Sequence, residues 1–239
     1  MQHEITQAIP LLDEQGELTQ PGWARRLLPV YDRSRVRGGP LRLKERDCYL
    51  VMNRQCALAL TISDNRYMGM DSISLIDLWE GWQVTRSPMR LMPLGGTGLP
   101  QSSLRGSCAR AGRGYGLLFQ HEGEGRTLHA HMDRFRDGQA LDAQILLTQE
   151  PEESIVMCTP FEKPGQFYFN QKINCMRAQG KVTLGDREYV FDPEDSFAVL
   201  DWGRGVWTCR STWYWGSASG MVDGVPFGFN IGYGFGDTS

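Results

Sequence analysis

Asp201 is the strongest candidate for acid–base chemistry, because it follows an apolar run and directly precedes Trp202. Burial disfavours the charged form of a carboxyl group and raises its pKa, which suits a general acid. Arg204 or Arg210 nearby would have the opposite effect and would make Asp201 half of a structural ion pair. A cap on the turn at 203–205 is a further role for this carboxyl. The sequence thus suggests Asp201 with Arg204 as a catalytic pair and leaves the structural alternatives open.

Polar side chains lie among aromatic ones in the last third of the chain, a composition typical of a mostly apolar pocket with a few orienting groups. The candidate ligand-binding residues are Asn170, Lys172, Asn174, Trp202, Trp207, Arg210, Trp213, Trp215, Phe227, Phe229 and Asn230. Turn or strand-edge hydrogen bonding explains each polar member equally well. Aromatic strands are also more often core than pocket.

Histidines offer the best pattern for a metal site. His129 and His131 share one face of a strand, and His121 would lie across the same hairpin, an arrangement that can bind zinc. No further ligand cluster accompanies them, so we favour a solvated hairpin face. We expect no metal and no cofactor.

The elements that must carry these residues are strands. Alternate positions from Phe227 to Phe235 are aromatic or apolar, with glycine and asparagine between them, which is the period of a strand. Tryptophans from Trp207 to Trp215 share one parity in the same way. Asp223-Gly224 between these segments is a typical two-residue hairpin turn. We therefore expect an aromatic-lined antiparallel hairpin of 207–215 and 227–235.

Short strands separated by turn signals recur along the chain, and no long segment has a helical apolar period. Turns are expected at 122–125, 136–139 and 185–187. The pattern predicts an all-β protein with a lead-in of residues 1–40, a first β domain of 41–165 and a second from 166 to 239. Because the last strand lacks an evident partner, we expect the second domain to be incomplete in this chain.

Charge and cysteine content narrow the function classes. The net charge of −3 gives no general attraction for nucleic acid, and the basic residues between Arg25 and Arg46 are best explained as a solvated face. Six cysteines occur singly, as expected for buried free thiols in a reducing compartment. No segment approaches the roughly 20 apolar residues of a membrane-spanning helix, and no signal peptide is evident. These features predict a soluble cytoplasmic protein with an unknown oligomeric state.

Several motifs resemble a bacterial family known as domain of unknown function 2804. They are Phe167-Tyr168 with Lys172 and Asn174, Gly180 with Val182, Tyr189 and Phe191, the run Leu200-Asp201-Trp202-Gly203-Arg204-Gly205, and Trp213 with Trp215. The resemblance extends from about Arg42 to the end of the chain.

More distantly, the order of these motifs is similar to that of the tandem lipocalin-like (calycin) proteins related to hydroxyneurosporene synthase and tocopherol cyclase. That resemblance implies two lipocalin-like antiparallel β-barrels in tandem, each with an apolar cavity. In some members an Asp-His motif protonates a terpenoid double bond, whereas here Trp202 follows Asp201.

Binding of a hydrophobic small molecule, lipid- or terpenoid-like, is the function that we expect. One alternative is a hydratase, cyclase or isomerase with Asp201 as general acid. Another is a structural or partner-binding β module.

Overall fold

The computed structural model describes residues 3–208 and 210–237, and within these ranges the chain forms strands and one 3-10 turn, η1 (Arg33–Arg35), but no α-helix. This confirms the all-β prediction. The strands are β1 (Ile9–Pro10), β2 (Gly22–Ala24), β3 (Pro29–Val30), β4 (Lys44–Met52), β5 (Cys56–Asp64), β6 (Met68–Asp77), β7 (Trp82–Arg86), β8 (Met89–Leu91), β9 (Gly106–Gly112), β10 (Tyr115–His121), β11 (Arg126–Arg136), β12 (Gln139–Thr148), β13 (Ile155–Pro160), β14 (Phe167–Leu184), β15 (Arg187–Phe191), β16 (Phe197–Val206), β17 (Tyr214–Val222) and β18 (Val225–Tyr233).

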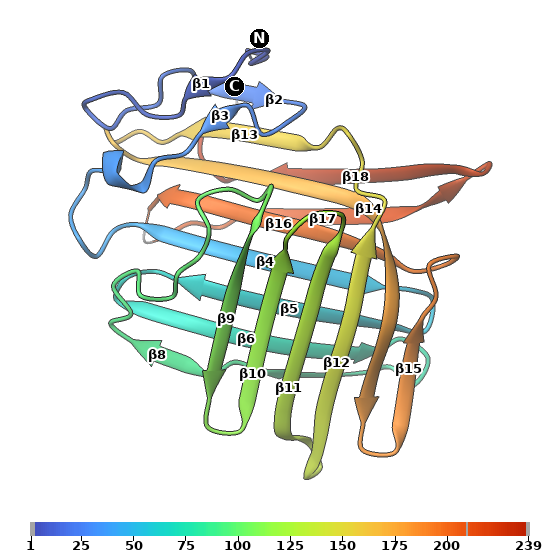
Figure 1. Cartoon of the computed structure of the whole chain (residues 1–239). Helices are drawn as coiled ribbons and strands as arrows, with labels where there is room; N and C mark the ends of the chain where they lie inside the picture. The colour runs from blue at the N-terminus through green and yellow to red at the C-terminus, as the bar shows by residue number, and fades with distance from the viewer. Residues whose placement is uncertain (1–2, 209, 238–239) are drawn as a thin grey trace.

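Fourteen strands form one sheet that folds over into two crossed layers (Figure 1). The 18-residue β14 belongs to both layers: its first half pairs with β13 and β16, and its second half pairs with β12 and β15. A register shift between Ile173 and Met176, with Cys175 at a φ of 61°, marks the bend. Among the described strands the two ends of the path, β7 and β9, do not pair, so the sheet is not closed into the expected barrel.

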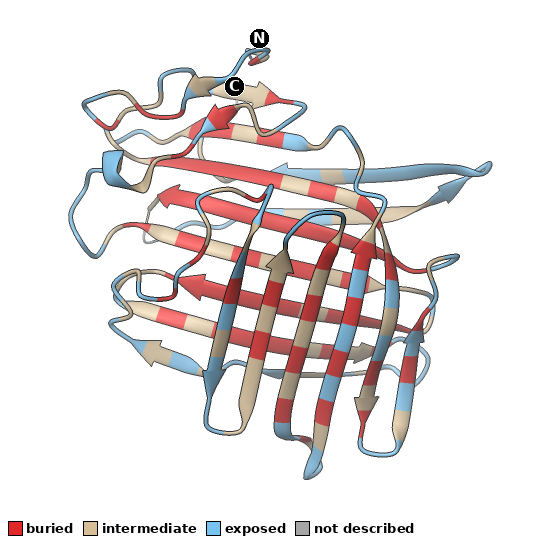
Figure 2. Cartoon of the chain, viewed as in Figure 1, coloured by how far each residue is buried: buried red, intermediate tan, exposed pale blue. Residues whose placement is uncertain are grey.

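Apolar residues of both layers form one core. Tyr49 of β4 packs edge-on against Phe119 of β10, with ring centroids 5.0 Å apart. At the other end the Tyr189 hydroxyl of β15 donates a hydrogen bond of 3.0 Å to buried Asp77 of β6. Alternate residues of β12 face solvent, as expected for an antiparallel layer with one covered face (Figure 2).

β16 differs from β12 in that all ten of its residues are buried (Figure 2). Its inner face packs into the core, and its outer face lies beneath the separate two-stranded hairpin of β17 and β18. The hairpin turn is confirmed, because Val222 pairs with Val225 around Asp223-Gly224, whose φ angles are 50° and 78°. The first strand was placed wrongly: β17 begins at Tyr214, and Trp207 precedes it. Cys209 lies outside the described residues.

The other expected hairpin turns are confirmed. They join β10 to β11, β11 to β12, and β14 to β15. The division at residue 166 stays a prediction, although β4, before that boundary, pairs along its length with β16, after it.

The described cysteines are free thiols, and four of these five are buried. Within the part of the chain that the structure describes, no helix combines the length and apolar character needed to span a bilayer.

Candidate ligand-binding site

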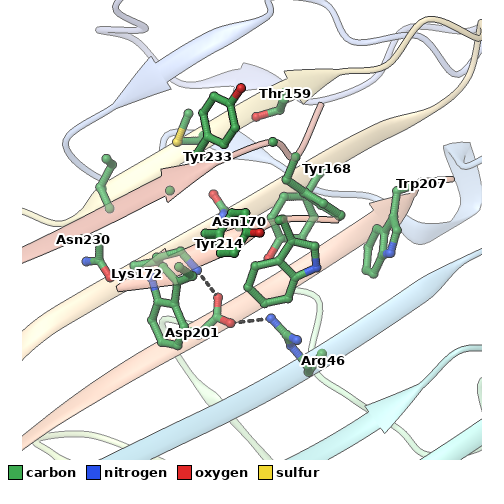
Figure 3. Close-up of a pocket in the computed structure, with 17 residues that line it drawn as sticks. Arg46, Thr159, Tyr168, Asn170, Lys172, Asp201, Trp207, Tyr214, Asn230 and Tyr233 are labelled. Atoms are coloured by element: carbon green, nitrogen blue, oxygen red, sulfur yellow. Dashed lines mark hydrogen bonds and ion pairs between the residues drawn. The ribbon is translucent and has the colours of Figure 1, made fainter. Parts of the chain in front are cut away.

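A cavity of about 330 Å³ lies between the β17–β18 hairpin and the outer face of the layer that contains β4, β13, β16 and the first half of β14 (Figure 3). Its floor is formed by β13, β14, β16 and β4, and its roof by the hairpin with the segments on either side of it. This volume is at the small end of the range for small-molecule pockets.

Strand parity decides which side chains reach the floor. Asn170 and Lys172 of β14 point to the outer face, whereas Phe169 and Ile173 point into the core. Lys172 pairs with Asp201 of β16, and the next strand, β4, places Arg46 opposite Gly203. Three antiparallel neighbours thereby bring together charges that are 29 to 155 positions apart.

Asp201 lies between two cations (Figure 3). Arg46 Nη2 donates to its Oδ2 and Lys172 Nζ donates to its Oδ1. Burial by itself would raise the pKa of Asp201, but the charges of Arg46 and Lys172 and their hydrogen bonds outweigh burial and lower it. Asp201 is therefore ionised at neutral pH. The expected raised pKa is wrong, and the residues that prevent it are Arg46 and Lys172 rather than Arg204 or Arg210.

Lys172 is largely buried and lies beside an aromatic ring. Its side chain is 14% exposed, and its Nζ lies 4.7 Å from the ring centroid of Trp215. Burial lowers the pKa of Lys172 by more than the neighbouring Asp201 raises it. The side chain of Arg46 is 33% exposed, and the charge of Asp201 raises its pKa although burial acts to lower it.

Aromatic rings form the walls. Phe235 is central, with its ring centroid 4.8 Å from that of Tyr168, 5.8 Å from Trp207 and 6.1 Å from Trp213. Trp215 completes the wall on the hairpin side. These five residues are called the aromatic wall below.

Asparagines connect the hairpin to the floor. Trp215 Nε1 donates to Asn230 Oδ1 at 3.0 Å, and Asn230 Nδ2 donates to Asn174 Oδ1. Asn174 Nδ2 in turn donates to the Ala218 carbonyl at 2.8 Å. Asn170 differs, because its Oδ1 atom is buried beside the cavity without a hydrogen-bond partner.

Glycines on β16 make room for the cavity floor. A Cβ atom on Gly203 would lie 2.9 Å from Tyr168 Cε2, so the tyrosine ring occupies the space that a side chain would fill. Gly205 has a φ of 155°, and a Cβ atom there would lie 2.2 Å from the Phe167 carbonyl oxygen. The two glycines of the Leu200–Gly205 motif thus have steric roles.

Seven of the predicted site residues line this cavity. They are Asn170, Lys172, Asp201, Trp207, Trp213, Trp215 and Asn230. Asn174 and Phe229 lie instead along a neighbouring groove of the hairpin, together with Lys172 and Asn230.

The remaining predicted residues lie elsewhere. Trp202 and Arg204 point into the core between the layers, where the Arg204 Nη1 donates to Asp47 at 2.8 Å. Arg210 is exposed and Phe227 is 56% exposed, and neither borders the cavity. Gly228 of β18 lies against Asn174 and Cys175 of β14. The glycine and asparagine face of β18 therefore meets β14, and its aromatic face points away.

Arg46, Tyr168 and Phe235 were missed as site residues. Arg46 was grouped with a solvated basic face, yet its neighbours Asp47 and Cys48 begin a run that ends in apolar residues. Charged residues at both odd and even positions of such a strand indicate that both of its faces are covered. Parity also separates Asp201 from Arg204, three positions apart.

The histidine pair belongs to a surface hairpin. His131 hydrogen-bonds Asp142 through Nδ1 at 2.8 Å and Asp133 through Nε2 at 3.0 Å, and these contacts raise its pKa. In residues 3–208 and 210–237 no three histidine, cysteine or acidic residues are grouped as a metal site.

Solved structures similar to the chain include a protein described as AttH from Nitrosomonas europaea (11% identity, 78% of this chain and 59% of that one, TM-score 0.46). Two others are kievitone hydratase from Nectria haematococca (10% identity, 88% and 61%, TM-score 0.39) and CghA with Sch210972 (11% identity, 95% and 67%, TM-score 0.40).

The chain spans 59% and 61% of the length of the first two structures. The comparison with curated proteins found no match. The family model described as "Domain of unknown function (DUF2804)" matches residues 2–239, which confirms the resemblance carried by the motifs of the last third, and the chain therefore belongs to this family.

Proposed function

We propose that the protein binds an apolar small molecule, lipid- or terpenoid-like, in the cavity beneath the β17–β18 hairpin. The observation that carries the proposal is the cavity of about 330 Å³ bordered by the aromatic wall. Binding pockets are typically concave, mostly apolar and provided with a few placed polar groups. The floor supplies those groups through Asn170, Lys172 and Asp201.

Exposure of the rings favours binding over a purely structural role. Phe167, Phe169 and Trp202 are buried in the core and serve packing. Trp213, by contrast, is 43% exposed and Tyr214 is 70% exposed, although both border the cavity. Large rings that remain partly in water beside a cavity can gain further burial from a ligand.

The enzyme alternative receives less support. A general acid must hold its proton at neutral pH, whereas Arg46 and Lys172 keep the pKa of Asp201 low. We therefore restrict the proposal to binding.

The neutral probe N-phenyl-1-naphthylamine, which fluoresces in apolar surroundings, tests this proposal. We expect saturable binding to the intact chain. Trp213→Ala should weaken it about tenfold, because an aromatic contact contributes about 1.4 kcal/mol. Trp79→Ala is the matched control, since Trp79 is 73% exposed and does not border the cavity.

Two results contradict the proposal. One is the absence of saturable probe binding to a folded protein. The other is an equal loss of affinity in the Trp213→Ala and Trp79→Ala variants, which would place the probe outside the cavity. Native mass spectrometry of protein purified from its own host then identifies the class of any co-purifying molecule.

A further inference from the structure

The floor of the cavity carries more positive than negative charge. Among the described residues that line it, the charged side chains are Arg46, Lys172 and Asp201. Two cations and one carboxylate leave a formal charge of +1. Both carboxylate oxygens are already engaged, with Oδ2 accepting from Arg46 and Oδ1 from Lys172.

This excess charge lies where water is scarce. The side chains of Lys172 and Asp201 are 14% and 4% exposed. A charge in such a place is costly unless a second group of opposite sign approaches it. Lys172 has three N–H donors and Arg46 has five, so donors remain for a second acceptor besides Asp201.

Asn170 provides an independent observation that points to a polar group on the ligand. Its Oδ1 atom is buried beside the cavity and has no hydrogen-bond partner, although the residue is only 5% exposed. A buried acceptor without a donor is unfavourable, and a ligand N–H or O–H group would satisfy it. Asn170 lies two residues from Lys172 on the same strand face, about 7 Å along the strand.

We propose that the ligand is an apolar organic acid: its anionic group, a carboxylate or similar oxyanion, binds Lys172 and Arg46, and an N–H or O–H group on it donates to Asn170. The apolar body then lies against the aromatic wall. This assignment rests on the proposed binding function and adds that the bound molecule carries a negative charge.

A matched pair of probes separates charge from apolar binding. N-phenyl-1-naphthylamine is neutral, and 1-anilinonaphthalene-8-sulfonate has the same rings and the same N–H with an added sulfonate. We expect the sulfonate to bind the intact chain roughly tenfold more tightly, as an added charge-assisted hydrogen bond predicts. Asp201→Asn should increase this preference, because it removes the competing carboxylate.

Lys172→Met should abolish the preference while the neutral probe still binds, and Lys172→Arg should retain it. Lys181→Met is the control, since Lys181 lies on the same strand but is 57% exposed and pairs with Glu188. Near-ultraviolet circular dichroism of each variant verifies that the tertiary fold is retained.

The outcomes separate this inference from the proposed function. If the neutral probe binds as tightly as the sulfonate, the inference is wrong and apolar binding stands. Equal weakening of both probes by Lys172→Met would also overturn it, because that result assigns Lys172 a packing role. If neither probe binds, the proposed function itself fails.

Discussion

Replacement of Asp201 by asparagine tests the charge arrangement of the site. The carboxyl is 4% exposed and accepts from both Arg46 and Lys172, so the variant leaves two cations close together without a counterion. Removal of one member of a buried ion pair lowers the free energy of unfolding by about 3 to 5 kcal/mol. We expect about 3 kcal/mol, the lower end of that range, because Arg46 is 33% exposed and can turn toward water. The melting temperature should fall by roughly 6 to 12 °C.

Urea unfolding at neutral pH, followed by tryptophan fluorescence, measures this loss. Asp133→Asn is the control, since that carboxylate is 58% exposed beside His131 and should cost less than about 1 kcal/mol. The double variant Asp201→Asn/Lys172→Met also removes one of the two cations that Asp201→Asn leaves without a counterion. Its loss of stability should therefore be smaller than the sum of the two single losses, by a coupling energy of at least about 1 kcal/mol.

The pH dependence has a definite sign. The folded-state pKa of Asp201 is lowered, so its contribution is complete above the ordinary carboxyl pKa of about 4 and is lost as pH falls through the lowered value. The stability difference between wild type and Asp201→Asn should therefore shrink in acid. A loss below about 1 kcal/mol at neutral pH, or no coupling to Lys172, would refute the ionised arrangement.

Two further predictions concern the cavity. Gly203→Ala places a Cβ 2.9 Å from Tyr168, so the free energy of unfolding should fall by about 1 to 3 kcal/mol and the affinity for the neutral probe should drop. Gly216→Ala, with nothing within 4 Å of the added Cβ and no place in the cavity lining, should change neither. Equal effects of the two variants in urea unfolding and probe titration would contradict the steric role of Gly203. Burial lowers the pKa of Lys172, so affinity for the anionic probe should decline as pH rises through that pKa while the neutral probe is unaffected, and parallel pH profiles would disprove it. The ionisable groups around Lys172 are Asp201, Arg46, Cys48, Tyr168, Tyr214 and Tyr233, together with Arg25 and Glu153 along the neighbouring groove.

Local patterns in the chain were sufficient for the all-β class and for the hairpin turns. Period-two alternation and the Asp223-Gly224 pair depend on backbone geometry within a few residues, so they are visible without tertiary contacts. The same locality explains the error at 207–215. Tryptophans of equal parity occur there, but the strand begins at Tyr214, and the rings of Trp207 and Trp213 pack against Phe235 instead of extending the strand.

Parity along β14 would have placed Asn170 and Lys172 on one face, although the sequence analysis selected them only as polar residues among aromatic ones. It could have separated Asp201 from Arg204 as well, since residues three apart on a strand point to opposite faces. The roles of the β18 faces were not predictable in this way, because either face of an amphipathic strand can meet the sheet. Close contact of Gly228 with Asn174 selects the glycine face.

The sequence by itself determined that the chain is all β, that Asp201 follows an apolar run and that aromatic residues cluster near it. Only the tertiary structure decided the state of that carboxyl. Its partner Arg46 lies 155 positions away and reaches it because β4 pairs with β16. A pKa depends on the charges within a few ångströms, and strand pairing between distant segments sets those distances.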